Sequence, residues 1–222
     1  MGKICSGVLL LAALIGGDAF GASWFKLKRD YRKCAFPMCG GYFLETLNRP
    51  EFCGTRRKGA DEPCYVAQLD LSKGAVSRLP DHLDQVIVKG SIVPGELDVP
   101  VDYEQLVVEN AWRAPDGQVD KGRYFHLYDN GIRCITTPCA SVSARLLNKK
   151  KTVALESVVF AGGDPGLTID GEGVLVTGKL RRRRGLIKVF SVYSPVGQIP
   201  CSVPGLCGDQ DRVGDGVGIM RR

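Results

Sequence analysis

Residues 24–48 read WFKLKRDYRKCAFPMCGGYFLETLN, and residues 124–148 read YFHLYDNGIRCITTPCASVSARLLN. Both stretches begin with two aromatic residues, carry two cysteines separated by four residues, and end in Leu-Asn, and these positions lie 100 residues apart. A spacing that recurs at every shared position indicates two copies of one structural unit, each organised around a Cys-x4-Cys loop.

Short runs of alternating apolar and polar residues surround the repeat. They are rich in β-branched and aromatic side chains, which is typical of strands with one buried face. The runs are 24–28, 42–47, 65–71, 86–93 and 106–112, then 124–128, 141–147, 152–160, 173–180 and 186–193. The sequence therefore predicts an all-β fold of two tandem, disulfide-stapled antiparallel units, packed as a pseudo-twofold barrel or sandwich.

The N-terminal residues have the features of a signal peptide. The apolar run over 8–17 is too short to span a bilayer, and Ala19 and Gly21 suit a cleavage site after residue 21. We therefore divide the chain into a signal peptide (1–21), β unit one (22–115), β unit two (116–196) and a disulfide-looped flexible tail (197–222). The sequence predicts a secreted or periplasmic protein with no membrane span in the mature chain.

Eight cysteines remain once Cys5 leaves with the signal, and an even number in an exported chain favours disulfides. Unit two has one local pair, and the repeat transfers that pairing to unit one. The predicted bridges are Cys34–Cys39, Cys53–Cys64, Cys134–Cys139 and Cys201–Cys207. A cross-link between Cys34 and Cys134, or between Cys39 and Cys139, would instead staple the two units together. The spacings do not suit zinc, so we expect no metal and no cofactor.

Three segments resemble a known family. They are RKCAFPMCGGY at 32–42, CYVAQLDL at 64–71 and NGIRCITTPC at 130–139. These segments are similar to those of a family of exported bacterial domains of unknown function that carry paired Cys-x4-Cys loops. The resemblance covers most of the mature chain. It implies secretion, a compact domain and a bacterial source, and it implies no catalytic residues.

No common catalytic motif occurs in the chain. There is no Gly-x-Ser-x-Gly, no His-Glu-x-x-His and no phosphate-binding Gly-x4-Gly-Lys. Strand alternation points His126 toward solvent, away from the face of Phe125 and Leu127. We therefore expect a non-catalytic binding or structural module whose ligand the sequence does not identify. A hydrolase of an envelope polymer is the alternative, because paired carboxylates need not be close in sequence.

The two bridged loops are candidate recognition sites. A loop held between bridged cysteines has little conformational entropy left to lose on binding, as a protease inhibitor requires. The loops could therefore inhibit a secreted protease, or they could simply connect two strands. Their residues are Phe36, Pro37 and Met38, and Thr136, Thr137 and Pro138.

A cluster of cations between two predicted strands is a candidate anion-binding site. The formal net charge is only +6, yet five of the cations fall within residues 179–184. The matching connection of unit one begins Pro94-Gly95-Glu96 instead. This hairpin tip could bind an anionic envelope polymer, or it could be a solubilising turn. The candidate residues are Lys179, Arg181, Arg182, Arg183 and Arg184.

Overall fold

The computed structural model describes residues 21–197, except 55, 60–62, 116–120 and 164. Within these residues, all regular structure is β strand apart from two three-residue 3-10 turns. The prediction of an all-β fold is therefore confirmed. The expected signal peptide and the Cys201–Cys207 tail lie outside the described residues. No helix in the described part is long and apolar enough to cross a membrane.

The strands follow the alternating runs of the sequence. Those of the first half are β1 (Ser23–Arg29), β2 (Tyr42–Thr46), β3 (Phe52–Cys53), β4 (Arg56–Arg57), β5 (Cys64–Val66), β6 (Gln68–Asp70), β7 (Val86–Pro94) and β8 (Glu104–Arg113). Those of the second half are β9 (Arg123–Asp129), β10 (Val142–Leu146), β11 (Thr152–Leu155), β12 (Ser157–Phe160), β13 (Val174–Arg181) and β14 (Leu186–Pro195). The 3-10 turns are η1 (Leu83–Gln85) and η2 (Arg182–Arg184).

Twelve of the strands form one sheet, in the order β11-β10-β9-β13-β14-β8-β7-β1-β2-β5 with two strands off this path. Pairing along the path is antiparallel, while the two off-path strands run parallel to theirs, β6 to β8 and β12 to β14. The path ends at β5 and β11 and is not closed. The barrel or sandwich packing of the two units stays a prediction.

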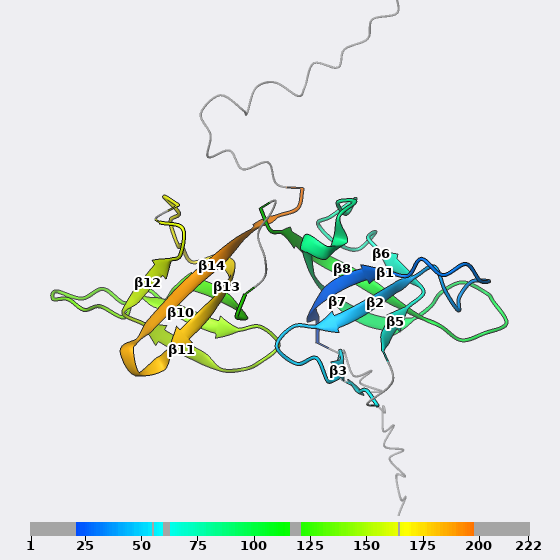
Figure 1. The fold of residues 1–222 in the computed structure, drawn as a ribbon, viewed down its shortest axis with the longest axis horizontal. Helices are drawn as coiled ribbons and strands as arrows, with labels where there is room; N and C mark the ends of the chain where they lie inside the picture. The colour runs from blue at the N-terminus through cyan, green and yellow to red at the C-terminus, as the bar shows by residue number, and fades with distance from the viewer. Residues whose placement is uncertain (1–20, 55, 60–62, 116–120, 164, 198–222) are drawn as a thin grey trace, which may run out of the picture.

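The duplication seen in the sequence recurs in the strand pairing. The order β5-β2-β1-β7-β8 in the first half corresponds to β11-β10-β9-β13-β14 in the second. Figure 1 shows these two sets as two lobes, and β8 pairs with β14 where the lobes meet. The β7–β8 pairing and the β13–β14 pairing also share a register shift at the matching glycine, which is Gly90 in β7 and Gly178 in β13.

Three apolar clusters make up the core. One surrounds Phe25 and Leu27 in the first half, and its counterpart surrounds Phe125 and Leu127 in the second. The third lies between the halves. It contains repeat-related residues from both sides: Leu47 with Leu147, Ile87 with Leu175, and Trp24 with Tyr124.

Two asparagines join the halves through reciprocal hydrogen bonds. Asn148 accepts from the Trp24 amide (2.8 Å) and donates to the carbonyls of Trp24 (2.8 Å) and Leu47 (2.9 Å). Asn48 accepts from the Tyr124 amide (3.2 Å) and donates to the carbonyls of Tyr124 (2.8 Å) and Leu147 (3.1 Å). Both asparagines adopt a left-handed backbone, with φ of 58° and 57°. Each bond therefore has its counterpart 100 residues away.

Three bridges form within the described residues: Cys34–Cys39, Cys53–Cys64 and Cys134–Cys139. No cross-link joins the halves among these residues. The Cys53–Cys64 bridge ties the small β3–β4 hairpin to β5, and this hairpin is part of the extra length of unit one.

Candidate anion-binding site

The basic hairpin tip borders a pocket of the second half. The pocket has a volume of about 800 Å³. Seven cationic side chains line it, and no carboxylate is among its described lining residues. These cations are Arg123, Lys151, Lys179, Arg181, Arg182, Arg183 and Arg184. The structure therefore places the predicted cluster beside two further cations from distant parts of the chain.

Three separate segments of the chain supply these cations. β13 ends at Arg181, and η2 turns the chain back through Gly185, which has the positive φ of 53° that suits glycine. Arg123 begins β9, which pairs with β13 through Arg123 and Gly178. Lys151 immediately precedes β11. Strand register therefore collects cations that are up to 61 residues apart in sequence.

The seven cations are exposed, and none of the described acids forms an ion pair with them. All have exposed side chains, and no carboxylate within the described chain lies at ion-pair distance from any of them. Glu156 approaches the tip, since a Cβ on Gly185 would lie 3.0 Å from its Cγ, but Glu156 does not line the pocket. Within the described residues, the positive charge of the pocket is therefore not offset by an ion pair.

The interior of the pocket is apolar. Phe125, Ala144 and Leu146 are buried residues of the second-half core that also line it. Val153, Leu180 and Phe190 complete this interior and are half-buried. Phe190 is the extra residue of β14 at the register shift, between Val189 and Ser191. Bulges of this kind re-aim a side chain, which here reaches the pocket.

The equivalent region of the first half is covered by its own chain. Thr46 stands where the repeat has Leu146, and its hydroxyl donates to the carbonyl of Phe52 in β3. Ile92 stands where the second half has Leu180, and its Cδ1 lies 3.5 Å from where a Cβ on Gly54 would be. Leu44 replaces Ala144. The second half has no counterpart of the β3–β4 hairpin among its described strands, so the pocket is a feature of that half.

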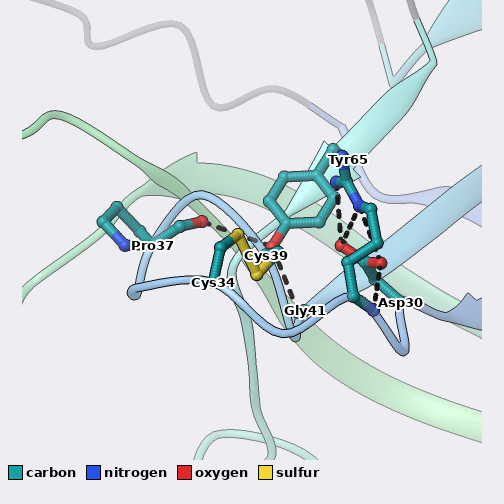
Figure 2. The surroundings of a disulfide bond; sticks show 7 residues. Asp30, Cys34, Pro37, Cys39, Gly41 and Tyr65 are labelled. Carbon is teal, nitrogen blue, oxygen red and sulfur yellow. Dashed lines mark hydrogen bonds and ion pairs between the residues drawn. A yellow bond between two sulfur atoms is a disulfide. The ribbon is translucent and has the colours of Figure 1, made fainter.

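The first bridged loop is held at its base by several contacts (Figure 2). The Tyr65 hydroxyl accepts from the Gly41 amide (3.1 Å) and donates to the Pro37 carbonyl (3.3 Å). The Arg32 guanidinium donates to both carboxylate oxygens of Asp30, from Nε to Oδ1 at 2.9 Å and from Nη2 to Oδ2 at 2.8 Å, and this hydrogen bonding holds the pKa of the Asp30 carboxyl below its usual value. Pro37 is buried, whereas Phe36 and Met38 are 43% and 61% exposed. The loop therefore presents two apolar side chains from a fixed base.

The second bridged loop is built in a similar way. Arg133 donates to both oxygens of Asp129, at 2.9 and 2.7 Å, and lowers the pKa of that carboxyl to about 2. Asn130 donates to the Ala140 carbonyl (2.8 Å) and so closes the loop base. Thr136, Thr137 and Pro138 are exposed together with Ile135. Neither bridged loop lines the basic pocket.

His126 differs from its expected position in open solvent. Its Nε2 lies 2.8 Å from the Glu172 carbonyl, and the ring stacks on Tyr128. Burial lowers the pKa of His126 below its ordinary value. The alternation correctly turned this side chain away from Phe125, but the chain around Glu172 covers it. Among the described residues, no group of histidines, cysteines or acids is placed to hold a metal ion.

Comparison with known proteins places the chain in a family. A family model described as a domain of unknown function, DUF6748, matches residues 23–184. The chain belongs to the DUF6748 family. The match includes both bridged loops and ends with the basic tip at Arg184, and the description of the DUF6748 domain assigns no activity.

One curated relative is an uncharacterized protein of Dictyostelium discoideum. It is 27% identical over 145 residues, which cover 63% of this chain and 47% of the relative. The chain thus spans about half the length of the relative it matches. This relative gives no support to the bacterial source that the resemblance implied. No solved structure matches the chain significantly.

Sequence reasoning found the tip of the site and missed the rest. The five cations at 179–184 stand out because they fall within six consecutive residues. Arg123 and Lys151 are isolated in sequence, and only strand register brings them to the tip. Phe125 and Leu146 have the alternation of ordinary core residues, so no local signal marked them as pocket residues. The absence of the hairpin from unit two was the one available clue.

Proposed function

We propose that this protein is a non-catalytic binding module, and that the basic pocket of the second half binds an anionic envelope polymer. The observation that carries the proposal is the convergence of seven cations on one pocket with no carboxylate in its described lining. Electropositive clefts concentrate anionic ligands and speed their association. A turn that served only solubility would not need Arg123 and Lys151 beside it.

The proposal includes export. Three disulfides within the described residues are typical of chains that fold in an oxidising compartment. We propose a secreted or periplasmic location, where an anionic polymer of the cell surface would be within reach. A cysteine-alkylation experiment on protein from the native source tests this, because freely alkylated cysteines in the intact protein would contradict export.

Salt dependence is the most direct test of polymer binding. Cations that neutralise a polyanion release its counterions, so retention on heparin should fall steeply as salt rises. Replacing the four arginines at 181–184 with serine should abolish most of this retention. A control variant replaces Lys33, Arg57, Lys73 and Arg78, which are exposed cations outside the pocket, and changes the net charge equally. An equal loss of heparin retention in both variants would show that retention depends only on net charge, and would overturn the proposal.

Strand order gives independent support for a binding module. We infer that each half is a partly open five-stranded barrel of the OB type. β5 and β6 are separated by Ala67 alone and act as one third strand, which pairs with β2 and, in parallel, with β8. OB-folds bind oligonucleotides and oligosaccharides. Amide hydrogen exchange that showed no protection in β6 and β12 would contradict this inference.

A second candidate function is inhibition of a secreted protease by the bridged loops. The exposure of Phe36 and Met38 on a loop anchored by Tyr65 favours it. Such a loop loses little entropy on binding. Inhibition of a protease panel should weaken on Met38→Gly and remain on Thr137→Gly if the first loop is responsible. No inhibition of any protease by the intact protein would remove this candidate.

A further inference from the structure

The polymer-binding proposal uses only the charge of the pocket, whereas its interior is apolar. We infer that the ligand of this pocket is an amphiphilic anion, whose aliphatic chain enters the pocket and whose phosphate or carboxylate headgroup binds the arginines of the tip. This inference rests on the proposed function and names the ligand class of the same site. A purely polar polyanion would leave the interior unused.

The shape and lining of the pocket suit an aliphatic chain. Its volume of about 800 Å³ lies in the range of small-molecule sites, which are mostly apolar with a few placed polar groups. Phe125, Ala144 and Leu146 form a buried apolar surface within it. Phe190, placed by the bulge in β14, adds an aromatic side chain. Val153, Leu180 and Phe190 are half-buried, so part of each side chain contacts water, and an aliphatic chain would remove this unfavourable contact.

The first half shows what occupies this position when no ligand is needed. There, the segment 52–54 is fastened to β5 by the Cys53–Cys64 bridge. Its Phe52 carbonyl accepts from the Thr46 hydroxyl, and its Gly54 lies beside Ile92. Cys53 and Ile92 pack against the first-half core. The same fold therefore fills this position with an apolar segment of its own chain in one copy and leaves it open in the other. The open copy is the one that carries the cations.

The headgroup side of the site follows from the charges. The 3-10 turn of Arg182–Arg184 borders the pocket. Arg123, at the start of β9, and Lys151, just before β11, also line it. Arginine presents a planar fork of donors that matches phosphate and carboxylate oxygens. The apolar interior of the pocket would thus hold the aliphatic tail of the ligand, and the cationic rim would hold its charged headgroup.

A chain-length series separates this inference from binding by charge alone. The intact protein would be titrated with hexyl, octyl, decyl and dodecyl phosphate below their micelle concentrations, and with inorganic phosphate. Each buried methylene should tighten binding about three- to fourfold until the pocket is filled. Inorganic phosphate, which has the same headgroup chemistry, should bind far more weakly than decyl phosphate. Equal affinity across the series would overturn the inference.

Two variants distinguish a failure of the amphiphile inference from a failure of the polymer-binding proposal. Ala144→Leu introduces the residue of the first half into the interior and should weaken decyl phosphate at least about tenfold, given the methylenes it displaces. Replacing the arginines at 181–184 with serine should weaken both ligands. Unchanged decyl phosphate affinity in Ala144→Leu sinks the amphiphile inference alone, and unchanged heparin retention in the arginine variant sinks the polymer proposal. Val153→Phe, at the half-buried edge, replaces Ala144→Leu if that variant does not fold.

Discussion

Asn148 combines a left-handed backbone with three hydrogen bonds to the other half. Its partners are backbone groups of Trp24 and Leu47, which lie in or beside the core between the halves. Asparagine is among the few residues that adopt this backbone at little cost while its side chain bonds to nearby main chain. The side chain thus satisfies main-chain groups at the interface between the halves, as a capping side chain does at the end of a helix.

We expect Asn148→Ala to destabilise the protein by about 1–3 kcal/mol, because it leaves the backbone groups of Trp24 and Leu47 without their partner. Asn148→Gly should be milder, because glycine keeps the positive φ at no steric cost while losing the same hydrogen bonds. Urea unfolding of both variants measures the difference. An alanine variant as stable as the parent would show that the asparagine bonds contribute nothing.

Asp129 gives the protein a specific sensitivity to acid. Arg133 lowers the pKa of its carboxyl to about 2, below the value of about 3.9 for an unfolded chain. A carboxyl with a lowered folded-state pKa contributes stability above the unfolded value, and this contribution is lost as pH falls through the folded value. Between about pH 4 and pH 2, Asp129→Asn should therefore lose less stability than the parent. Identical pH profiles from urea unfolding would contradict this expectation.

Among the elements, the repeated glycine of β7 and β13 marks a close backbone contact. A Cβ on Gly90 would lie 2.3 Å from the Val107 carbonyl oxygen, and one on Gly178 would lie 2.7 Å from that of Lys188. The register shifts at both positions, and the extra residues are Glu109 in β8 and Phe190 in β14. The two copies thus share one bulge but use its extra residue differently, since Glu109 pairs with Lys89 while Phe190 lines the pocket.

Gly90→Ala should destabilise the protein by about 1–3 kcal/mol, because the backbone of β8 must move to admit the methyl group. Gly171→Ala is the matched control, since nothing lies within 4 Å of the added Cβ there. Thermal unfolding of the two variants checks this expectation. Similar melting temperatures would show that the ladder accommodates the methyl group without loss.

The strands that sequence predicted best are long strands with a partner on each side. Residues 86–93 and 106–112 are rich in β-branched residues and become β7 and β8. The run 152–160 was expected as one strand but divides at Glu156, because β11 pairs with β10 and β12 pairs with β14. The two-residue strands β3 and β4 are too short for alternation to mark. The change of partner strand at Glu156 and the two-residue pairing of β3 with β4 both arise from tertiary contacts. A local sequence pattern does not record such contacts.

The whole molecule carries its only two tryptophans where the halves meet. The rings of Trp24 and Trp112 lie 4.7 Å apart, and both pack on the cluster between the halves. Tryptophan fluorescence therefore reports on this interface. Because the cluster and the asparagine bonds join the halves into one cooperative unit, we expect fluorescence and far-ultraviolet circular dichroism to change together in urea. Fluorescence that changed at lower urea would show that the halves separate before they unfold.

The reciprocal bonds of Asn48 and Asn148 obey the rule of an isologous dimer, in which residue i of one copy contacts j of the other and j contacts i. Two copies of one short chain could have made the same interface, but every substitution would then have appeared on both sides. A tandem gene lifts that restriction. One copy can keep its disulfide-bonded β3–β4 hairpin while the other acquires an open basic pocket. Joining the copies in one chain therefore gives each of them a separate evolutionary history.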